Sequence, residues 1–433
     1  MEFTAEVFDQ VQRLFDLNGF NDHQLHCVLR FEAGRGPDPE ILRKAVIASI
    51  EAIPILGTRY VADGKPRWVS LDRSDLDRAF MTARTEPELE AALVARADEE
   101  RGPQIRLCLL DSDPAAIALT INHMITDGAG CKAYLYFLCA TYAGLAADPN
   151  FKPTPIAGDR GIGRVLDRLG FGAKLVSLVA QRGDNNRSGD RCFPFSKGGT
   201  TRPFIVTLKL DRQRTAALRD YGHAQGATLN DLLLASLYRC LFEKLALSPG
   251  AELTVPVMVD MRRYLDAGEA STALTNLSSM VATRLDYRPG EGFADTLRRV
   301  KAAMDEKKSG DIGLNSFVKL ALLFRLRGDR IANRVLRSRL RNPFIAMTNI
   351  GVLDEARLVF GDRRPSDAYV FGSIKYRPYF QLAVSSYQDE LTLTINLDGT
   401  PADREAVVSV LDALDGELQN AAQVLHLPEP ARA

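Results

Sequence analysis

One short stretch of the sequence combines side chains that could carry out acid–base chemistry, Ile121-Asn122-His123-Met124-Ile125-Thr126-Asp127-Gly128-Ala129-Gly130. An imidazole suits a general base because its ordinary pKa lies near physiological pH. Asp127 could hold the turn in one geometry, or it could cap a following helix, since Asp is a preferred N-cap residue. Gly128 and Gly130 would allow positive φ and a close approach of a ligand to the backbone. These residue types make His123 a candidate catalytic base, with Asp127 and Gly128 beside it in the same candidate site.

The segments on either side of this stretch would hold His123 on a turn between a strand and a helix. Residues 116–121 are apolar and β-branched, which predicts a buried strand. Residues 131–144 carry apolar side chains at helical spacing, which predicts a helix. A histidine at the end of a strand is often an ordinary core residue, so the spacing by itself leaves both interpretations open.

Length and charge limit the classes of function. The chain has 433 residues, and its 55 Lys and Arg balance 55 Asp and Glu, so its net charge is zero. This length predicts two or three domains around a large core, and the charge balance gives no field that would favour nucleic acid. Residues 1–6 do not resemble a signal peptide, and no apolar stretch has the length of a membrane span. We therefore expect a cytoplasmic protein, monomeric and without a transmembrane segment.

Cysteines, histidines and glycines do not form the pattern of a metal or nucleotide site. Six cysteines are scattered without a Cys-x-x-Cys pair, which is typical of reduced, buried thiols in the cytoplasm. His23 and His26 are three residues apart, but no cluster of cysteines or carboxylates completes a metal site. The glycines at 158–163 do not follow a strand in Gly-x-Gly-x-x-Gly order. We expect no bound metal and no bound cofactor.

A change in sequence character near the middle divides the chain into two halves of similar size. Residues 152–163 are rich in Pro and Gly, and residues 182–190 are polar. We expect an N-terminal lobe over 1–180, a crossover linker over 181–203 and a C-terminal lobe over 204–433. Periodicity and cap residues predict helices at 4–17, 37–53, 131–144, 163–180 and 403–422, and strands at 24–31, 116–121, 204–210, 255–260, 278–286, 380–387 and 391–397.

The central stretch resembles the signature of a superfamily of acyl-transferring enzymes. His-x-x-x-Asp-Gly after a strand is similar to the motif of the chloramphenicol acetyltransferase-like acyltransferases. These include nonribosomal peptide condensation domains, plant-type BAHD acyltransferases, wax ester synthases and mycobacterial polyketide-associated acyltransferases. Looser similarities occur at 53–60, where Gly57 replaces the first arginine of the family pattern, at 228–235 and at 343–354. The resemblance implies an α/β fold of two similar lobes, each a mixed sheet flanked by helices, related by a pseudo-twofold axis with a central tunnel.

The resemblance also implies a partner for Asp127. The segment Val259-Asp260-Met261-Arg262 resembles the Val-Asp-x-Arg strand of the BAHD group, in which the arginine pairs with the aspartate of the central motif. This assigns a structural salt bridge to Arg262, with Arg263 as the second choice. A desolvated Asp127 would need such a cation, and a bidentate arginine can lock a turn. The alternative is a pair of solvated arginines at the end of a strand.

Three further polar residues are placed along the tunnel by the resemblance. Thr348 and Asn349 lie in a segment that resembles the Ser-Asn-x-Gly strand of condensation-type enzymes, so they could line the acyl site or support an oxyanion. Asn-x-Gly can equally end a strand in a turn. Asn122 replaces the first of two adjacent histidines found in many condensation and wax ester enzymes, whereas BAHD enzymes have only the second. His123 therefore keeps the role of the base.

The activity implied by the resemblance is transfer of an acyl group from a thioester to an alcohol or amine, without a covalent enzyme intermediate. His123 would take the proton of the attacking group, and backbone N–H groups near Gly128 would meet the oxyanion. The donor would be acyl-CoA, or an acyl or peptidyl carrier protein bearing a phosphopantetheine thioester. Two alternatives remain: a condensation enzyme that releases a carrier-bound chain onto an amine, and a non-catalytic docking module.

A strongly basic segment at residues 312–341 could serve an anionic donor. It contains seven arginines and Lys319 against Asp329, interleaved with apolar residues. Arg334, Arg337 and Arg339 could contact the phosphates of coenzyme A or an acidic carrier protein. The alternative is the solvated face of one or two surface helices.

Overall fold

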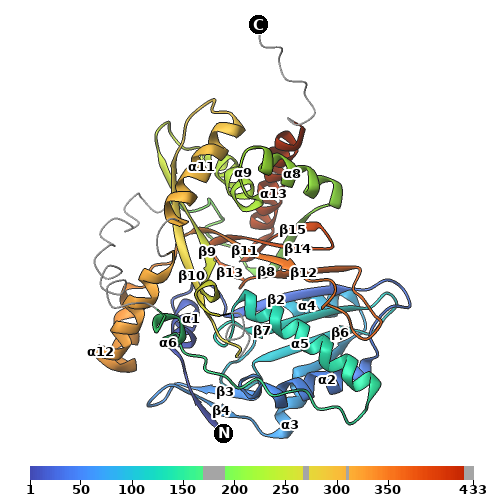
Figure 1. Cartoon of the computed structure of the whole chain (residues 1–433). Coiled ribbons are helices and arrows are strands. Elements are labelled where there is room, and N and C mark those ends of the chain that lie inside the picture. The colour runs from blue at the N-terminus through green and yellow to red at the C-terminus, as the bar shows by residue number, and fades with distance from the viewer. Residues whose placement is uncertain (169–190, 267–272, 309–311, 424–433) are drawn as a thin grey trace.

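The computed structural model of the protein describes residues 1–168, 191–266, 273–308 and 312–423. These residues form two lobes, each built on a mixed sheet with helices packed against it (Figure 1). The predicted α/β class with two lobes is confirmed. The predicted linker at 181–203 lies partly outside the described residues, as does most of the helix predicted at 163–180, whose described part is α6 (Gly163–Leu166).

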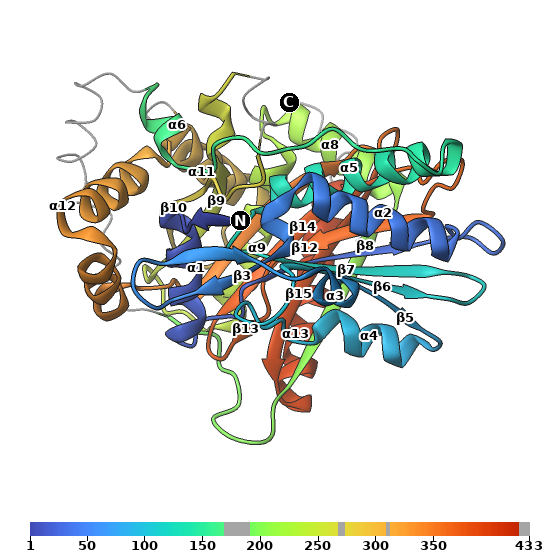
Figure 2. The same cartoon turned by 90° about the horizontal axis from the view of Figure 1, so that it is seen from below.

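The sheet of the N-terminal lobe contains the strand that leads to His123. In the described part of the chain it has five strands, in the order β12-β2-β7-β6-β5. Their bounds are Gln24–Arg30 for β2, Phe80–Ala83 for β5, Ile105–Leu110 for β6, Ala116–Asn122 for β7 and Asp367–Phe371 for β12. Every residue of β7 is buried, as its continuous apolar run predicts for a strand with both faces covered. Figure 2 shows α2 (Pro39–Ala52) and α5 (Gly128–Ala147) on one face and α4 (Glu86–Val94) on the other.

A small sheet beside the N-terminal lobe fixes the first helix. The described residues place its strands in the order β1-β4-β3. Trp68 on β4 is fully buried, and its Nε1 donates to Asp9 Oδ2 at 2.7 Å, which ties the sheet to α1. The elements of this region are β1 (Glu2–Thr4), α1 (Val7–Leu17), β3 (Thr58–Val61), β4 (Arg67–Ser70), α3 (Arg73–Leu76) and the 3-10 helices η1 (Pro54–Gly57) and η2 (Asp77–Ala79).

The sheet of the C-terminal lobe is larger and carries its helices on the side away from the N-terminal lobe (Figure 1). Its described strands run in the order β10-β9-β11-β14-β15-β13, and β8 also pairs with β15. The strands are β8 (Arg202–Leu210), β9 (Glu252–Asp260), β10 (Ser278–Asp286), β11 (Ile345–Leu353), β13 (Lys375–Tyr376), β14 (Phe380–Tyr387) and β15 (Glu390–Gly399). The covering helices are α8 (Arg212–Ala224), α9 (Leu229–Lys244), α11 (Phe293–Lys308) and α13 (Pro401–Gln423). Thr228 caps α9 in a reciprocal capping box with Asp231.

Strand β12 crosses from one half of the chain to the other. It follows β11 in sequence, yet it pairs antiparallel with β2, with Asp367 opposite Arg30 and Phe371 opposite His26. Residues 204–433, expected to form only the C-terminal lobe, therefore supply one edge of the N-terminal sheet. The physical reason is that β12 satisfies the hydrogen-bonding edge of β2, which would otherwise remain open. The two lobes are thus joined by shared strands.

The basic segment forms α12 (Leu314–Arg339), a long helix that projects at the side of the molecule (Figure 1). Gly328 interrupts it with φ 67 and ψ 162, so the helix bends there. Leu314 and Phe317 in its first half are fully buried against Phe8 and Val11 of α1. The kinked helix therefore rests on α1, while Arg334, Arg337 and Arg339 in its second half are exposed.

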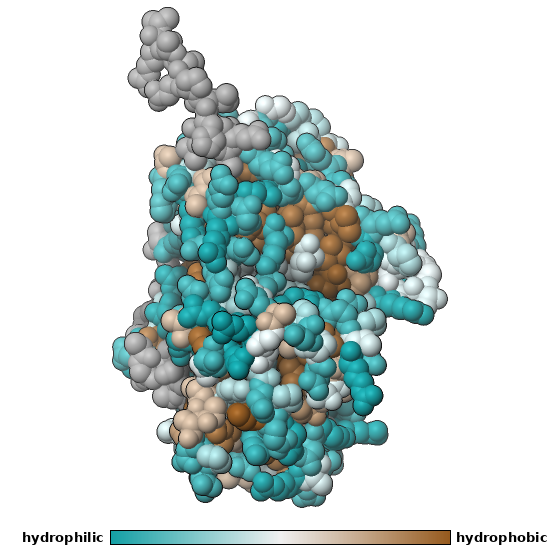
Figure 3. Space-filling model, turned by 90° about the vertical axis from the view of Figure 1, so that its right-hand side faces the viewer, coloured by the Kyte–Doolittle hydropathy of each residue, from teal (hydrophilic) through white to brown (hydrophobic). Residues whose placement is uncertain are grey.

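On the face shown in Figure 3, hydrophilic residues predominate and hydrophobic residues gather in separate patches between them. Exposed large apolar side chains of this kind are common on proteins whose cores are well filled. Within residues 1–168, 191–266, 273–308 and 312–423, no helix has the length and apolar character that crossing a membrane would require.

Candidate active site

His123 follows the last residue of β7 and is held on the turn by its backbone and its ring. Its N–H donates to the His23 carbonyl at 2.7 Å. The ring Nδ1 lies 2.8 Å from the Thr126 carbonyl oxygen, and because that oxygen can only accept, Nδ1 carries the proton. The Nε2 atom is then unprotonated and can act as a base. Burial lowers the pKa of His123, and the Thr126 carbonyl only partly offsets this, so the ring is neutral near pH 7.

Both oxygens of Asp127 are used by the protein. Oδ1 accepts the Gly130 N–H at 2.9 Å and caps α5, while Oδ2 accepts from Arg262 Nη1 at 2.8 Å and from the Leu277 N–H at 2.7 Å. The two interpretations of Asp127, as a helix cap and as the partner of an arginine, therefore hold together. Burial would raise the pKa of this carboxyl, but the charge and hydrogen bonds of Arg262 outweigh burial and lower it.

The structure brings Arg262 to Asp127, and it leaves Arg263 exposed. Arg262 lies in the 3-10 helix η3 (Met261–Tyr264) directly after β9. Its Nη1 also lies 3.1 Å from Asp260 Oδ1, and its Nη2 donates to the Thr275 carbonyl at 2.8 Å. The guanidinium thus connects the turn of the N-terminal lobe to two segments of the C-terminal lobe. Such a charged, multiply bonded contact restricts the turn to one geometry.

Gly128 and Gly130 do not have the positive φ that their residue type would allow. Both lie in the first turn of α5 and neither has positive φ, because Asp127 starts the helix three residues before its predicted beginning. A Cβ atom on Gly130 would lie 2.0 Å from Thr126 Oγ1. Gly130 is therefore required for close packing against the turn. Gly128 is less restricted, since its Cβ would meet Ile350 Cγ1 at 3.4 Å.

Gly130→Ala should lower the free energy of unfolding by about 1–3 kcal/mol, because Thr126 is fully buried and must move to admit the methyl group. Chemical denaturation followed by circular dichroism measures the change. Gly128→Ala is the matched control and should stay within about 1 kcal/mol of the wild type, since its contact is an ordinary one. Equal stability of the two variants would contradict the packing role of Gly130.

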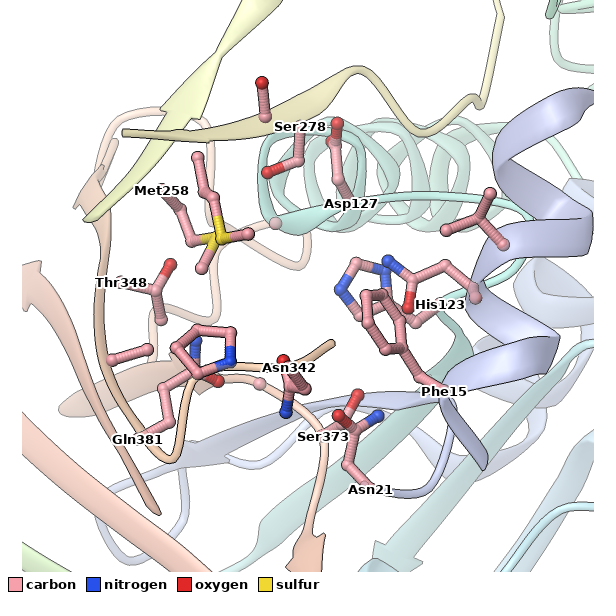
Figure 4. A pocket seen from close by; sticks show the side chains of 18 of the residues that line it. Phe15, Asn21, His123, Asp127, Met258, Ser278, Asn342, Thr348, Ser373 and Gln381 are labelled. Atoms are coloured by element: carbon pink, nitrogen blue, oxygen red, sulfur yellow. The ribbon is translucent and has the colours of Figure 1, made fainter. Parts of the chain in front are cut away.

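His123 faces a cavity of about 410 Å³ between the two lobes (Figure 4). Of the predicted site residues, His123, Asp127, Gly128 and Thr348 line it. The walls are mostly apolar and come from α1, β9, β10, β11, α12 and the segment before β14. Apolar members of the wall are Phe8, Val11, Phe15, Leu25, Met258, Met280, Leu320, Leu340, Ala346 and Ile350. The cavity has the size and lining of a site for an organic ligand.

Asn122 and Asn349 are not brought to this cavity. Asn122 is buried inside the turn, where its Nδ2 donates to Gln104 Oε1 at 2.5 Å and its Oδ1 accepts the Met124 N–H at 2.8 Å. Asn349 is exposed and its Oδ1 accepts the Gly351 N–H at 2.9 Å. Neighbouring strand residues point to opposite faces, so Thr348 and Asn349 could not both face the cavity. Both asparagines support local backbone geometry.

Arg334, Arg337 and Arg339 are exposed on the second half of α12, outside the cavity. Leu320 on the first half of α12 and Leu340, directly after its end, contribute to the cavity wall. The basic face therefore lies on an element that borders the cavity without entering it. A large anionic partner could contact this face while a smaller group enters the cavity.

Sequence reasoning missed two groups that hold the turn. Asn276 Nδ2 lies 3.1 Å from the His123 carbonyl oxygen and 3.3 Å from the His123 ring Nδ1. Arg160 makes a buried bidentate pair with Asp9, at 2.8 and 3.0 Å, and its Nη2 lies 3.3 Å from the Ile125 carbonyl. Neither group has a sequence signal, because each reaches the turn from a segment remote in the chain.

No group of three or more His, Cys, Asp or Glu side chains is arranged to hold a metal ion in the residues that the structure describes. His23 lies between two carboxylates, with Nδ1 3.6 Å from Asp16 Oδ2 and Nε2 3.2 Å from Glu99 Oε2. Burial alone would lower its pKa, but the neighbouring carboxylates of Asp16 and Glu99 raise it to about 9. Burial lowers the pKa of His26 to about 3. His23 is thus part of an ion-pair cluster, and His26 is a neutral core residue.

Residues 199–360 match the family model described as phthiocerol/phthiodiolone dimycocerosyl transferase C-terminus. No curated protein matches the chain by sequence at a significant level.

Several solved structures share the fold over nearly the whole chain. Trichothecene 15-O-acetyltransferase from Fusarium sporotrichioides is similar with a TM-score of 0.69 at 16% identity, covering 97% of this chain and 95% of that one. Polyketide synthase associated protein 5 from Mycobacterium tuberculosis is similar with a TM-score of 0.66 at 15% identity, covering 98% of this chain and 100% of that one. The first condensation domain of the calcium-dependent antibiotic synthetase is similar with a TM-score of 0.68 at 17% identity, covering 100% of this chain and 98% of that one. At these identities the likeness shows the fold. The chain therefore shares the two-lobed fold of these acyltransferase and condensation structures, which fits the superfamily that its sequence resembles.

Proposed function

We propose that the protein is an acyltransferase that moves an acyl group from a thioester to an alcohol or amine, with His123 as the general base. An acyltransferase or condensation-type function is supported by the matching family model and by similar structures such as the acetyltransferase and the condensation domain. The single observation that carries the proposed mechanism is the position of His123, which lines the apolar cavity between the lobes while its Nδ1 is held by the Thr126 carbonyl, so that Nε2 is left to act as the base.

In the proposed reaction, His123 Nε2 takes the proton of the acceptor's hydroxyl or amine as its oxygen or nitrogen attacks the thioester carbonyl carbon. The tetrahedral intermediate then collapses, the carbon–sulfur bond breaks, and the thiolate leaves with the proton that His123 returns. The negative oxygen of the intermediate would lie near the first turn of α5, where helix N–H groups lack partners within the helix. Asp127 would not touch the substrate, because Arg262, Gly130 and Leu277 use both its oxygens.

The proposed donor is acyl-CoA or an acyl group on a carrier protein. The apolar cavity walls suit an acyl chain, because burying each CH₂ group contributes about 0.8 kcal/mol. Both donors carry phosphate, and α12 presents exposed arginines beside the cavity. Surface arginines of this kind raise the rate of encounter with an anionic partner.

Replacing Arg334, Arg337 and Arg339 together with Gln should raise the donor KM by about 10-fold at low ionic strength, because steering by surface charge is lost. Above about 0.5 M salt the difference should disappear, since the Debye length falls below about 5 Å. The value of kcat at saturating donor should stay constant. Steady-state kinetics over a range of salt concentrations measures these effects.

A matched control replaces Arg73, Arg84 and Arg101, which are exposed on the N-terminal lobe, with Gln. This variant has the same change in net charge and should keep the wild-type KM and salt dependence. If both triple variants behave alike, the arginines of α12 form an ordinary solvated helix face.

The proposal is tested by incubating the protein with a panel of acyl-CoAs and acyl carrier proteins, each with candidate alcohols and amines, and detecting products by mass spectrometry. Product from acyl-CoA supports a free-standing acyltransferase. Product that forms only with a carrier protein and an amine favours a condensation enzyme. This is the second candidate function because the fold is similar to that of a condensation domain. Binding of a carrier protein without any product in the panel would favour a docking module.

A further inference from the structure

A lysine that the proposed reaction does not use also lines the cavity. Lys375 is the first residue of β13, where it pairs with Leu397 of β15, and an isolated bridge joins it to Asn21 of the N-terminal lobe. Its Nζ donates to Asn21 Oδ1 at 3.0 Å. Hydrogen bonds to both lobes thus fix the backbone of Lys375 beside the catalytic turn, since His23, two residues after Asn21, accepts the His123 N–H.

The ammonium group of Lys375 has no carboxylate partner among the described residues. No carboxylate oxygen of these residues lies within 4.0 Å of Lys375 Nζ. The carboxylate of Asp22 is turned to other donors: the Gln24 and Ile374 N–H groups, at 3.2 and 3.0 Å, and Gln24 Nε2. Burial lowers the pKa of Lys375 to about 8, with a partial offset from Asp22. A cation kept in a cavity wall without an anion is held at a desolvation cost, which a bound anion would offset.

A second polar group at the same place also lacks a partner. Ser373 is only 2% exposed, and its hydroxyl has no hydrogen-bond partner among the described residues. Buried hydroxyl groups are nearly always hydrogen-bonded, so an orphan that lines a cavity indicates a missing ligand. Figure 4 shows Ser373, Asn21 and Asn342 together on one side of the cavity, below His123 in this view. These side chains and Lys375 give the cavity a polar corner.

We propose that Lys375 and Ser373 form a subsite for a carboxylate carried by one of the two substrates. The ammonium group would pair with the carboxylate, and the Ser373 hydroxyl would donate to one of its oxygens. The one ammonium group of Lys375 matches the single negative charge of a carboxylate, whereas phosphate sites usually gather several donors or an arginine fork. This inference rests on the proposed function, because it names the substrate class of the same cavity.

The subsite would hold one substrate by a group that takes no part in the reaction. Binding energy from such a group orients the reacting centre, and it also excludes analogues that lack the group. A neutral analogue would leave Lys375 and Ser373 unpaired in the cavity, which makes discrimination strong. The carboxylate can belong to the acyl group or to the acceptor, and the two sources are separable by experiment.

The test compares two ligand pairs that differ only in the carboxylate, by isothermal titration calorimetry on the full chain. Succinyl-CoA against butyryl-CoA examines the donor, and 12-hydroxydodecanoate against its methyl ester examines the acceptor. In one pair the acid should bind about 10-fold or more tightly than its neutral analogue, the usual value of a hydrogen bond to a charged group. Lys375→Met should abolish this ratio and leave the affinity of the neutral ligand unchanged.

Lys152→Met, at an exposed position, is the matched control and should keep the wild-type ratio. Ser373→Ala should reduce the ratio without removing it, and it provides a second measurement if Lys375→Met does not fold. Equal binding of acid and neutral ligand in both pairs overturns the subsite, as does a loss of affinity for acid and neutral ligand alike in Lys375→Met. Because binding is measured without turnover, selective binding with no acyl transfer would retain the subsite and contradict only the proposed function.

Discussion

His123→Ala should fold like the wild type and lose about 100-fold or more in kcat of acyl transfer, the usual contribution of a general base. The imidazole is half-buried, and its ring hydrogen bond is to the Thr126 carbonyl within the same turn. Its removal therefore eliminates the proton acceptor and leaves the Asp127–Arg262 contact in place. Single-turnover kinetics with the donor identified by the panel measures the loss, and the melting temperature checks the fold.

His223→Ala is the matched control, because this histidine is exposed on α8 in the C-terminal lobe. It should retain full activity. The dependence of kcat/KM on pH gives an independent check: only neutral imidazole accepts a proton, so activity should rise with pH and level off above the pKa of His123. Burial lowers this pKa, so the inflection should fall below 6.5. Full activity of His123→Ala would rule out the proposed mechanism.

Asp127→Asn and Arg262→Ala should each lower the free energy of unfolding by about 3–5 kcal/mol, since either change leaves a buried polar partner without its counter-charge. The side chains are 4% and 11% exposed, so water screens their interaction weakly. Activity should fall as well, because the turn that carries His123 loses its link to the C-terminal lobe. A double-mutant cycle should show a coupling energy of about 0.5–3 kcal/mol.

Arg263→Ala provides the control, since this neighbouring arginine is exposed and should change stability by less than about 0.5 kcal/mol. The pH dependence has a defined sign. The pKa of Asp127 is lowered by folding, so its stabilisation is present above the unfolded pKa and is lost as pH falls through the folded pKa. Asp127→Asn should therefore show less loss of stability in acid than the wild type. Additive effects in the cycle would contradict the contact between Asp127 and Arg262.

Much of the fold could be predicted from patterns local in the sequence. The strands expected at 278–286 and 380–387 have those bounds in the structure, because hydrophobic runs ended by turn residues determine strand limits well. The helix after the central motif begins at Gly128, three residues before its expected start, because Asp127 acts as the cap. Strand β13, with only two residues, is too short for any period to reveal.

The site was predictable only where a motif or the family resemblance marked it. His123 and Asp127 stand in one motif, and Arg262 was assigned by resemblance to a strand of the BAHD group. Asn349 fails to reach the cavity because adjacent strand residues point to opposite faces. Lys375 and Ser373 carry no signal of their own, since they meet His123 only where the two lobes join.

The crossing of β12 has a consequence for the order in which the protein can form. The ribosome releases β2, β7 and β6 long before residues 367–371, so the edge of β2 that β12 later covers stays unpaired during most of synthesis. That edge belongs to a strand that is buried in the complete protein except at Arg30, and open strand edges attract other chains. The nascent N-terminal half must therefore be protected until nearly the whole polypeptide has emerged, and a chain terminated before residue 367 cannot complete its first sheet.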